Sequence, residues 1–517
     1  MSNIKQLLES QINLFFLHPF TALPFLFFFI FSIYKLLFNH KTRNHLPPSP
    51  SKLPIIGNLH QIDKKLPHRS LHSLAKQHGD LMLLYFGRKP VLVVSSAEAA
   101  CKVMKSHDTI FANRPILSMF KRLLYDCRDV ATAPYGDYWR RMRSICVNQL
   151  LSYNRVQAFH NVREEEIAQI VEEIRSSSPS KAVNLSKMLS NFSTDVICRA
   201  AFGMKFNGQR DGIDFKELHE KHEELIGSIN IGDFIPWLGW INHVNGVEKD
   251  VKRVSRNMDS FLESLVQEHK LKGINEGEKS ENKQDFVDVL LELQQDHSAE
   301  MSLDKDSIKG IILDMFVAGS TTTYATLEWV MSELLRNPTI MESLQKEVRE
   351  ITRDKANITE NDLEKMEYLK AVIKETFRLH PPVPLLLPRI SSRETQLNGY
   401  DIPAKTQVII NAWTIHRDPS FWKEPERFNP ERFLNSSIDF KGQHFNLIPF
   451  GSGRRGCPGI YFGTANLELV LANFMQKFDW ALPEGAQGKN LDMEEHPGVT
   501  IHRETPLRAI ATPRFTW

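Results

Sequence analysis

The chain has 517 residues, and its 64 Lys and Arg residues nearly balance its 62 Asp and Glu residues, which gives a formal net charge of only +2. This balance argues against a partner held mainly by bulk charge, such as nucleic acid. A composition of 42% hydrophobic and 24% charged residues excludes disorder for most of the chain and predicts a large buried core.

The cysteines are few and far apart. Their total is odd and no two form a CxxC pair, which argues against both a disulfide framework and a structural zinc site. They are Cys101, Cys127, Cys146, Cys198 and Cys457. The sequence therefore predicts free thiols in a reducing compartment.

The N-terminal residues predict a membrane anchor. Ile12–Tyr34 contains no Lys, Arg, Asp or Glu, and as a helix it would extend roughly 35 Å, enough to cross a bilayer. A cleaved signal peptide is the alternative, but no small-residue cleavage site follows. Because Lys35, Lys41 and Arg43 follow the apolar run, we expect the rest of the chain to lie in the cytosol.

Three segments are predicted in chain order: a membrane anchor over residues 1–39, a Pro-rich connector over residues 40–58, and a catalytic domain over residues 59–517. The connector contains Leu46–Pro54, whose prolines favour a stiff extended chain.

The catalytic domain is predicted to be mainly α with small β-sheets. Two short strands are expected within Leu81–Val94, and Gln407–Ala412 is a further candidate strand. The polar stretch Lys272–Lys283 predicts a mobile surface loop. Apolar residues spaced three and four apart predict helices over Glu164–Ile174, Met258–Lys270 and Asp306–Arg336.

The most informative stretch is the glycine-rich loop Pro449–Gly459. Its glycines allow the backbone to pass close to a flat ligand and to adopt positive φ, and a helix is expected over Tyr461–Phe474. Cys457 precedes this helix, where the macrodipole and neighbouring amide groups stabilise a thiolate. For the other cysteines an inert, buried thiol is the expected state.

This loop resembles the haem-binding loop of the cytochromes P-450, the haem-thiolate monooxygenases. The resemblance covers nearly the whole chain and is closest to the plant microsomal A-type group, near family 71. It implies that the Cys457 thiolate ligates the iron of haem b, where a thiolate favours O–O cleavage.

The resemblance also assigns a structural cluster. Glu375 and Arg378, three apart on a predicted helix, match the family's ExxR element. An arginine from a later Pro-Glu-Arg-Phe element joins them in the family. Arg432 matches this arginine, although Arg427 stands in a second copy of the element.

Contacts to the haem are assigned by the same resemblance. Trp139 and Arg143 match the WxxxR element, and without the other motifs they would be taken for an ordinary surface stack. Arg389 and Arg455 resemble the remaining partners of the haem propionates, since guanidinium groups suit carboxylates. The loop residues Phe450 and Gly459 complete the predicted cofactor site.

A run of small and β-branched residues, Ala318–Thr323, interrupts the predicted helix Asp306–Arg336. Close helix packing is one explanation. The family explanation is an oxygen-binding groove, in which Gly319 leaves room for dioxygen and the Thr322 hydroxyl relays protons. The family usually has an acid where this chain has Thr321, so water and the Thr321 and Thr322 hydroxyls would have to deliver protons.

The family's substrate-contacting segments predict a hydrophobic pocket above the haem. The same apolar residues could instead belong to the core, and Val499 could belong only to a turn. The predicted pocket residues are Leu117, Phe120, Ile312, Phe316, Ala318, Leu385, Leu386 and Val499.

The function implied is insertion of one oxygen atom from dioxygen into a small lipophilic plant specialised metabolite, which could be a terpenoid, an alkaloid, or a coumarin or other phenylpropanoid. No G-x-G-x-x-G fingerprint follows a strand, so the electrons are expected to come from another protein. The resemblance implies that this protein is an NADPH-dependent cytochrome P-450 reductase on the endoplasmic reticulum membrane. Arg140, Arg141 and Arg454 form a hypothetical docking face, or merely a solvated one. The alternatives are a haem-thiolate isomerase or dehydratase that needs no reductase, and a non-enzymatic haem carrier or sensor.

Overall fold

The structure is a computed structural model, and it describes residues 23–24, 27–33, 45–177, 181–205, 209–210, 213–276, 284–295, 303–353, 355 and 357–514. The chain divides into two compact units. One comprises Met1–Leu46 with Gly399–Asp401, and the other comprises Pro47–Asn398 with Ile402–Trp517.

In the first unit, residues 27–33 are helical and include exposed phenylalanines such as Phe27 and Phe28. Most of the predicted anchor, Ile12–Tyr34, lies outside the described residues. Within the part of the chain that is described, no helix combines the length and the apolar character needed to cross a membrane.

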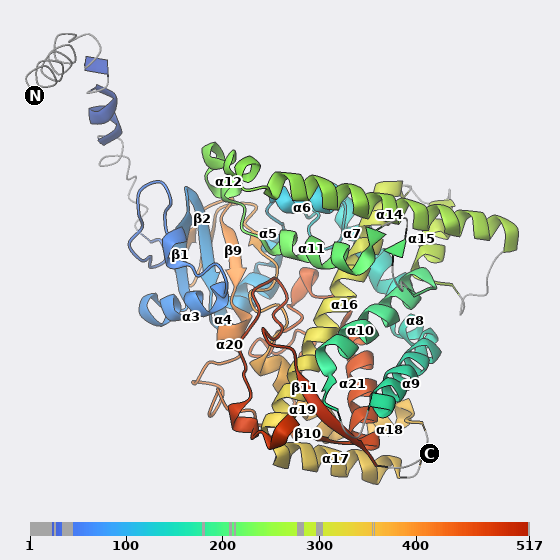
Figure 1. Ribbon diagram of the computed structural model, residues 1–517. Coiled ribbons are helices and arrows are strands. Elements are labelled where there is room, and N and C mark those ends of the chain that lie inside the picture. The colour runs from blue at the N-terminus through green and yellow to red at the C-terminus, as the bar shows by residue number, and fades with distance from the viewer. Residues whose placement is uncertain are drawn as a thin grey trace, which may run out of the picture. The chain divides into compact units, whose positions relative to one another are not determined.

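Helices dominate the second unit, as Figure 1 shows, which confirms the prediction of a mainly helical fold with small sheets. The α-helices are α3 (Pro67–His78), α4 (Ala97–Cys101), α5 (Asp108–Phe111), α6 (Ser118–Leu123), α7 (Asp137–Ile145), α8 (Tyr153–Ala158), α9 (His160–Ser177), α10 (Leu185–Phe202), α11 (Phe215–Gly227), α12 (Ile231–Phe234), α13 (Ile241–Val244), α14 (Val247–Glu276), α15 (Phe286–Gln295), α16 (Lys305–Arg336), α17 (Pro338–Thr352), α18 (Glu360–Glu364), α19 (Glu367–Leu379), α20 (Ala412–Ile415) and α21 (Ile460–Lys477). Short 3-10 turns are η1 (Leu59–Gln61), η4 (Pro236–Leu238), η6 (Pro430–Phe433), η7 (Gly453–Arg455), η8 (Pro483–Gly485) and η9 (Gly488–Asn490), and η2 (Lys102–Ser106) and η3 (Cys146–Leu150) are π-helical.

Each predicted helix lies within an observed one, namely α9, α14, α16 or α21, although α14 begins well before the predicted Met258, at Val247. The start of α16 is fixed by Asp304, whose side chain accepts a hydrogen bond from the Ser307 backbone N–H. The predicted loop Lys272–Lys283 is wrong at its beginning, because α14 continues to Glu276. Leu271 and Lys272 are good helix formers, and the single Gly273 does not outweigh them. Residues 277–283 lie outside the described residues.

The strands form small sheets. They are β1 (Leu81–Phe86), β2 (Lys89–Val94), β3 (Val183–Asn184), β4 (Gln209–Arg210), β5 (Ile213–Asp214), β6 (Arg389–Ile390), β7 (Thr395–Leu397), β8 (Tyr400–Ile402), β9 (Gln407–Ile410), β10 (Phe478–Ala481) and β11 (Arg508–Pro513). One sheet has the order β1-β2-β9-β6 and another the order β10-β11-β3.

The predicted strands come together in the first sheet. β1 and β2 form an antiparallel hairpin in which Leu81 lies opposite Val94, and β9 runs parallel to β2. The predicted strand Gln407–Ala412 ends early, at Ile410, because the Asn411 side chain caps α20 by accepting from the Thr414 N–H. β6 pairs antiparallel with β9 and thereby fixes the position of Arg389, its first residue.

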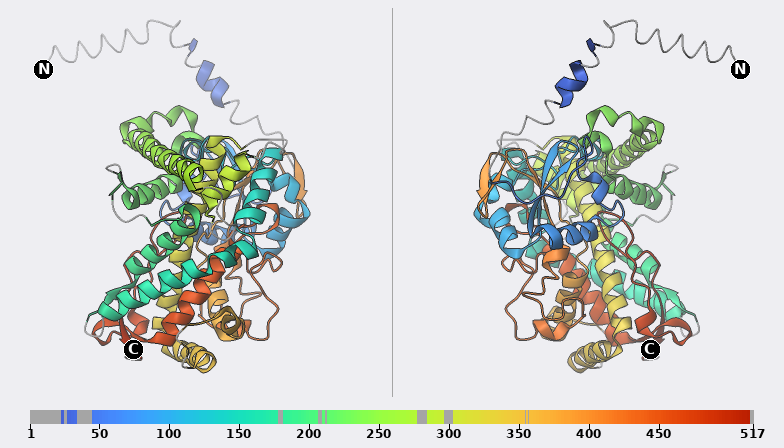
Figure 2. Two further views of the ribbon diagram at one scale, coloured as in Figure 1. Left: turned by 90° about the vertical axis from the view of Figure 1, so that its right-hand side faces the viewer. Right: turned by 90° about the vertical axis from the view of Figure 1, so that its left-hand side faces the viewer.

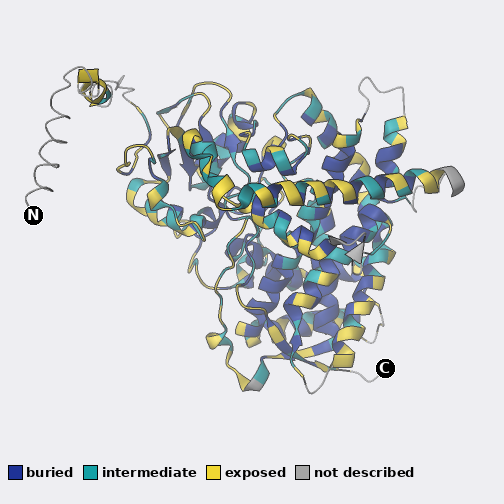
Figure 3. Ribbon diagram, turned by 45° about the horizontal axis from the view of Figure 1, so that its top comes forward, coloured by how far each residue is buried: buried dark blue, intermediate teal, exposed yellow. Residues whose placement is uncertain are grey.

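Helix α16 is the centre of the second unit. It contacts α10, α19 and α21, and the two views of Figure 2 show it crossing the helical part of the unit. α14 packs on α11 and α6, and Figure 3 shows exposed residues recurring along its length. The side facing the core carries buried apolar residues, including Val251, Val254 and Met258, as expected for an amphipathic helix.

Candidate functional site

One large cavity lies beside the middle of α16, with a volume of about 1460 Å³. Ala318, Thr321 and Thr322 line it from α16, and the glycine-rich loop contributes Phe450, Arg455 and Cys457. All five cysteines belong to the described residues, and Cys457 is the one that lines this cavity. The remaining lining comes mainly from α10, α11 and the turn before β6.

The loop is held in place by its own backbone. The Cys457 N–H donates to the Phe450 carbonyl at 2.9 Å, and the Gly459 N–H donates to the Cys457 Sγ at 3.3 Å. Gly453 has a φ of +70°, and a Cβ there would lie 2.0 Å from the Met104 carbonyl oxygen. Glycine is therefore required at position 453 both by the conformation and by the close approach of η2.

Burial raises the pKa of the Cys457 thiol, and the opposing effects of the Gly459 N–H and of Arg143 are smaller. The expected stabilisation of a thiolate at the start of α21 is present, but it does not outweigh the cost of desolvation. A bound metal ion would be needed to remove the proton outright.

Four arginines line the same cavity: Arg114, Arg143, Arg389 and Arg455. Burial, and to a smaller extent the neighbouring cation of Arg389, lower the pKa of Arg455 to about 9. Burial and the charges of Arg389 and Arg455 likewise hold the pKa of Arg114 well below its ordinary value. The cluster is an excess of buried positive charge, which suits a ligand carrying carboxylates.

The predicted partners Trp139 and Arg455 lie together. The Arg455 guanidinium stands over the Trp139 ring at 4.2 Å, and its Nε and Nη2 donate to the Ala112 and Ala133 carbonyls at 2.7 and 2.6 Å. The Trp139 Nε1 donates to the Val130 carbonyl at 3.0 Å. These bonds fix both side chains at the wall of the cavity.

The structure also brings Glu375, Arg378 and Arg432 together. Glu375 and Arg378 on α19 are fully buried, and the carboxylate accepts from the Arg378 Nε and Nη2 at 2.7 and 2.9 Å. The Arg432 Nε completes the cluster at 3.1 Å. The side chain of Arg427, the other candidate, is exposed and pairs instead with Glu424.

Gly319 does not have the predicted role. A Cβ at this position would approach the Ile197 side chain of α10 to 2.9 Å, and Gly319 is not among the residues that line the cavity. Its lack of a side chain allows α16 and α10 to pack closely, so the packing explanation is correct here. In a helix, residue 319 points about 100° away from Ala318, which does face the cavity.

The threonines after Gly319 do line the cavity. The Thr322 hydroxyl donates to the Ala318 carbonyl at 2.7 Å. The Thr321 hydroxyl lies 2.7 Å from the Glu223 Oε1 of α11 and 3.0 Å from the Val317 carbonyl oxygen.

Five of the eight predicted pocket residues lie at the cavity. Phe120, Phe316, Ala318, Leu386 and Val499 line the cavity.

Leu117, Ile312 and Leu385 do not line it, contrary to expectation. Ile312 lies one turn before Phe316 and is fully buried in the core. Leu117 packs against the main core and Leu385 against the smaller core beside β1 and β2.

The predicted docking face is partly neutralised. Arg140 pairs with Asp137, and Arg454 pairs with Asp108 at 3.2 Å. Both guanidinium groups remain about half exposed, at 53% and 48% of the side chain. Arg141 is half-buried.

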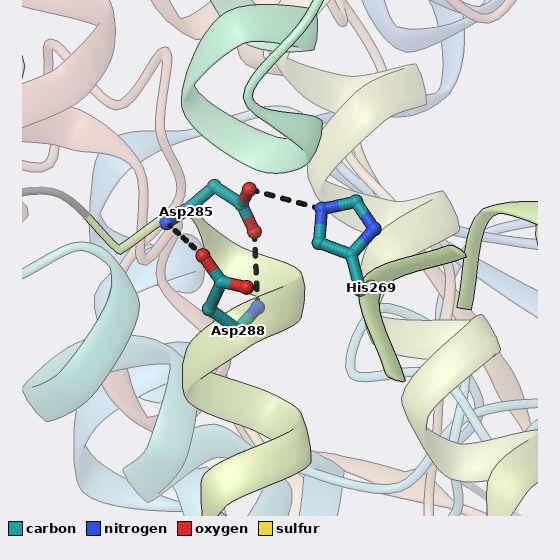
Figure 4. A group of neighbouring side chains, drawn as sticks. All are labelled: His269, Asp285 and Asp288. Atoms are coloured by element: carbon teal, nitrogen blue, oxygen red, sulfur yellow. Dashed lines mark hydrogen bonds and ion pairs between the residues drawn. The ribbon is translucent and has the colours of Figure 1, made fainter. Parts of the chain in front are cut away.

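Outside the cavity, one cluster within the described residues has the composition of a metal site. His269 of α14 lies beside Asp285 and Asp288 at the start of α15, as Figure 4 shows. The His269 Nε2 is 3.0 Å from Asp285 and its Nδ1 is 2.9 Å from the Leu265 carbonyl oxygen. Each aspartate also accepts from the other's backbone N–H. The cluster is a helix cap that joins α14 to α15.

A mainly helical fold around one cavity, with a cysteine loop and buried arginines on its wall, is the arrangement of a haem-thiolate protein. The family profile described as Cytochrome P450 matches residues 47–507, and the chain belongs to this family.

The chain is 51% identical to cytochrome P450 736A117 of Prunus mume, over 97% of either chain. It is 49% identical to (+)-menthofuran synthase of Mentha piperita, over 92% of this chain and 94% of that protein. A zebra fish cytochrome P450 solved with progesterone has a TM-score of 0.75 and 27% identity, over 86% of this chain and 99% of that one. The chain is therefore an oxidoreductase of the monooxygenase class with the P450 fold.

Membership of the family implies a haem bound through a cysteine thiolate. The cavity fits this group, because Cys457 opens into it and the buried arginines lack an equal number of carboxylate partners. Asp108 is the carboxylate that pairs with Arg389, at 3.3 Å, and it is shared with Arg454. The two propionates of a haem would supply the missing negative charge.

Two cavity residues were not found from the sequence. Arg114 stands in an Asn-Arg-Pro stretch that carries no local signal of burial. Glu223 is one of several acids in the charged pattern of α11. Both become apparent only when helices distant in the chain pack together.

Proposed function

We propose that this chain inserts one oxygen atom from dioxygen into a small lipophilic plant specialised metabolite, and that the Cys457 thiolate would hold the haem iron. The observation that carries the proposal is the meeting of Cys457, the buried arginines and Thr322 at one cavity whose remaining wall is largely apolar. The other cysteines support the assignment, since none of Cys101, Cys127, Cys146 and Cys198 lines the cavity.

Arg143, Arg389 and Arg455, with Trp139, would hold the haem propionates, and Arg114 joins them. The haem, when bound, supplies the activation of dioxygen. The protein side chains anchor the cofactor, exclude water from the apolar wall and place the substrate. Phe450 and Gly459 hold the loop that presents the Cys457 sulfur.

The Thr322 hydroxyl is proposed to hold and pass protons beside the place where oxygen reacts. It already donates to the Ala318 carbonyl within the helix, and a hydroxyl can donate and accept in the same chain of hydrogen bonds. Thr321 lies next to it on the same wall.

The substrate is proposed to be lipophilic because aromatic and aliphatic side chains form the wall away from the arginines. Phe215 and Phe316 pack with ring centroids 4.8 Å apart, and both line the cavity with Phe120 and Leu386. Burial lowers the pKa of His219 to about 3, so this residue adds no charge to the wall. One relative is named for making menthofuran, which agrees with a small product.

Electrons are proposed to come from an NADPH-dependent reductase on the endoplasmic reticulum membrane, with the catalytic domain in the cytosol behind an anchor at residues 1–39. The exposed parts of Arg140 and Arg454 support a docking face for an acidic partner.

Cys457→Ser tests the axial ligand. The expected result is loss of the thiolate signature in the carbon monoxide difference spectrum and loss of product in the presence of reductase and NADPH. Cys101→Ser is the matched control and should behave like the unchanged chain, because Cys101 does not line the cavity. A thiolate signature that survives Cys457→Ser would refute the assignment.

The reductase requirement separates the monooxygenase from an isomerase or dehydratase. A lipophilic metabolite library is screened by the spin-state shift of the haem, and binders are incubated with and without reductase. Product that forms without reductase or oxygen consumption would contradict the proposal.

A further inference from the structure

The family's usual acid is missing at position 321, yet a carboxyl group lies within hydrogen-bond distance of Thr321. Glu223, on α11, has its Oε1 2.7 Å from the Thr321 hydroxyl of α16. The two residues come from helices almost a hundred positions apart in the chain. The hydrogen bond with Thr321 thus holds a carboxyl group beside a position where this chain has no acidic side chain of its own.

The Glu223 carboxyl is well placed to carry a proton. Burial raises its pKa to about 7, the charge of Glu220 raises it too, and only the hydrogen bond from Thr321 opposes them. Near neutral pH the group therefore exists in both protonation states, as efficient proton transfer requires.

The Thr321 hydroxyl can respond to either state. When Glu223 is ionised, the hydroxyl donates to the carboxylate at 2.7 Å. When Glu223 is protonated, the carboxyl donates to the hydroxyl oxygen, and the hydroxyl hydrogen turns to the Val317 carbonyl at 3.0 Å. This reversal is the elementary step of a hydrogen-bonded proton relay.

Glu223 itself lines the cavity. The same cavity is lined by Glu220, which is exposed on α11, and by Thr322 and Cys457.

We propose that Glu223 delivers protons from solvent through Thr321 to the oxygen site beside Thr322, in place of the acid that the family usually carries on the central helix. The inference rests on the proposed roles of Cys457 and Thr322. The reaction consumes dioxygen, two electrons from the reductase and two protons, and yields one oxygen atom in the product and one water. Glu223 passes protons on and is reloaded from solvent, so it is unchanged overall. The path from Thr321 to Thr322 runs through water in the cavity.

The key variant is Glu223→Gln, which keeps a hydrogen-bonding partner for Thr321 but cannot release a proton. We expect haem content and the substrate-induced spin shift to stay unchanged. Product formed per dioxygen consumed should fall roughly tenfold, with hydrogen peroxide rising, which is less than the full effect of a general acid because water can substitute in part.

Glu224→Gln is the matched control. This residue follows Glu223 on α11, but it is exposed and accepts from Lys221 at 2.8 Å. It should couple oxygen consumption to product as the unchanged chain does.

The second variant restores the acid. Thr321→Asp in the Glu223→Gln background should recover most of the lost coupling, because it places a carboxylic acid at the family position. A loss that this change does not repair would overturn the relay and leave Glu223 as a packing contact between α11 and α16. Coupling in Glu223→Gln equal to that of the unchanged chain would overturn it equally.

An infrared measurement gives a readout independent of turnover. The C=O absorption of a protonated carboxyl should appear on going from mildly alkaline to mildly acidic pH in the holoprotein, and Glu223→Gln should remove that band. A carboxyl that stays ionised throughout would refute the proposal. Failure of the proposed monooxygenase function can be distinguished from failure of the Glu223 relay. In the first case the unchanged chain would form no reductase-dependent product, whereas the infrared band of Glu223 would still be measurable.

Discussion

Removing the carboxylate of Glu375 is the most severe single test of the buried cluster of Glu375, Arg378 and Arg432. Four hydrogen bonds end on this carboxylate: two from Arg378, one from the Asn429 backbone N–H at 2.8 Å, and one from Arg432. Glu375→Ala leaves the guanidinium of Arg378 fully buried without a counter-charge, although the His416 and Pro425 carbonyls still accept from it at 2.9 and 2.6 Å.

The expected loss is about 3–5 kcal/mol of the free energy of unfolding, the cost of orphaning one partner of a buried ion pair. Glu375→Leu combined with Arg378→Met should recover part of this loss, because the orphaned charge is then absent. The control is Glu172→Ala on α9, whose partner Arg175 has the same i, i+3 spacing and two hydrogen bonds but is exposed. It should leave stability unchanged, since water replaces the lost contact.

Urea unfolding, followed by tryptophan fluorescence, measures the free energy, and the carbon monoxide difference spectrum reports how much protein retains haem-thiolate. Both signals should fall at lower urea for Glu375→Ala than for Glu172→Ala. Equal unfolding midpoints for the two variants would refute the reasoning, because burial is the property that distinguishes the two pairs.

Three further outcomes are expected. Burial lowers the pKa of His269, but the hydrogen bond and charge of Asp285 outweigh burial, so the pKa lies above the ordinary 6.5. The stability that this pair contributes should be complete below pH 6.5 and should be lost as pH rises through the raised pKa. Urea titrations at a series of pH values measure this dependence, and His269→Gln should abolish it. Gly319→Ala should cost about 1–3 kcal/mol by overpacking against Ile197, and adding Ile197→Ala should reverse the steric part of that cost; thermal unfolding that is insensitive to Gly319→Ala would contradict the close packing. Leu386→Ala, which shortens a cavity-lining side chain, should alter substrate affinity and the ratio of products while haem content stays constant, as measured by spectral titration and product analysis.

Local patterns in the sequence were sufficient to predict the long helices, the β1–β2 hairpin and the loop around Cys457. Periodic apolar residues and capping side chains act over a few positions, so α16 begins within a residue of its predicted start. Two predicted boundaries were wrong. Helix propensity extends α14 to Glu276 within a polar stretch, and the Asn411 cap of α20 ends β9 at Ile410.

The sequence by itself supplied the candidates for the site: the local pattern indicated a cysteine before a helix, and the resemblance to the family indicated the arginines and the threonine on the central helix. Only the tertiary structure decided that Gly319 faces Ile197, and that the acid beside Thr321 comes from α11 as Glu223. Spacing along a chain fixes which face of its own helix a side chain occupies. What that face meets depends on the packing of helices distant in sequence, which no local pattern records.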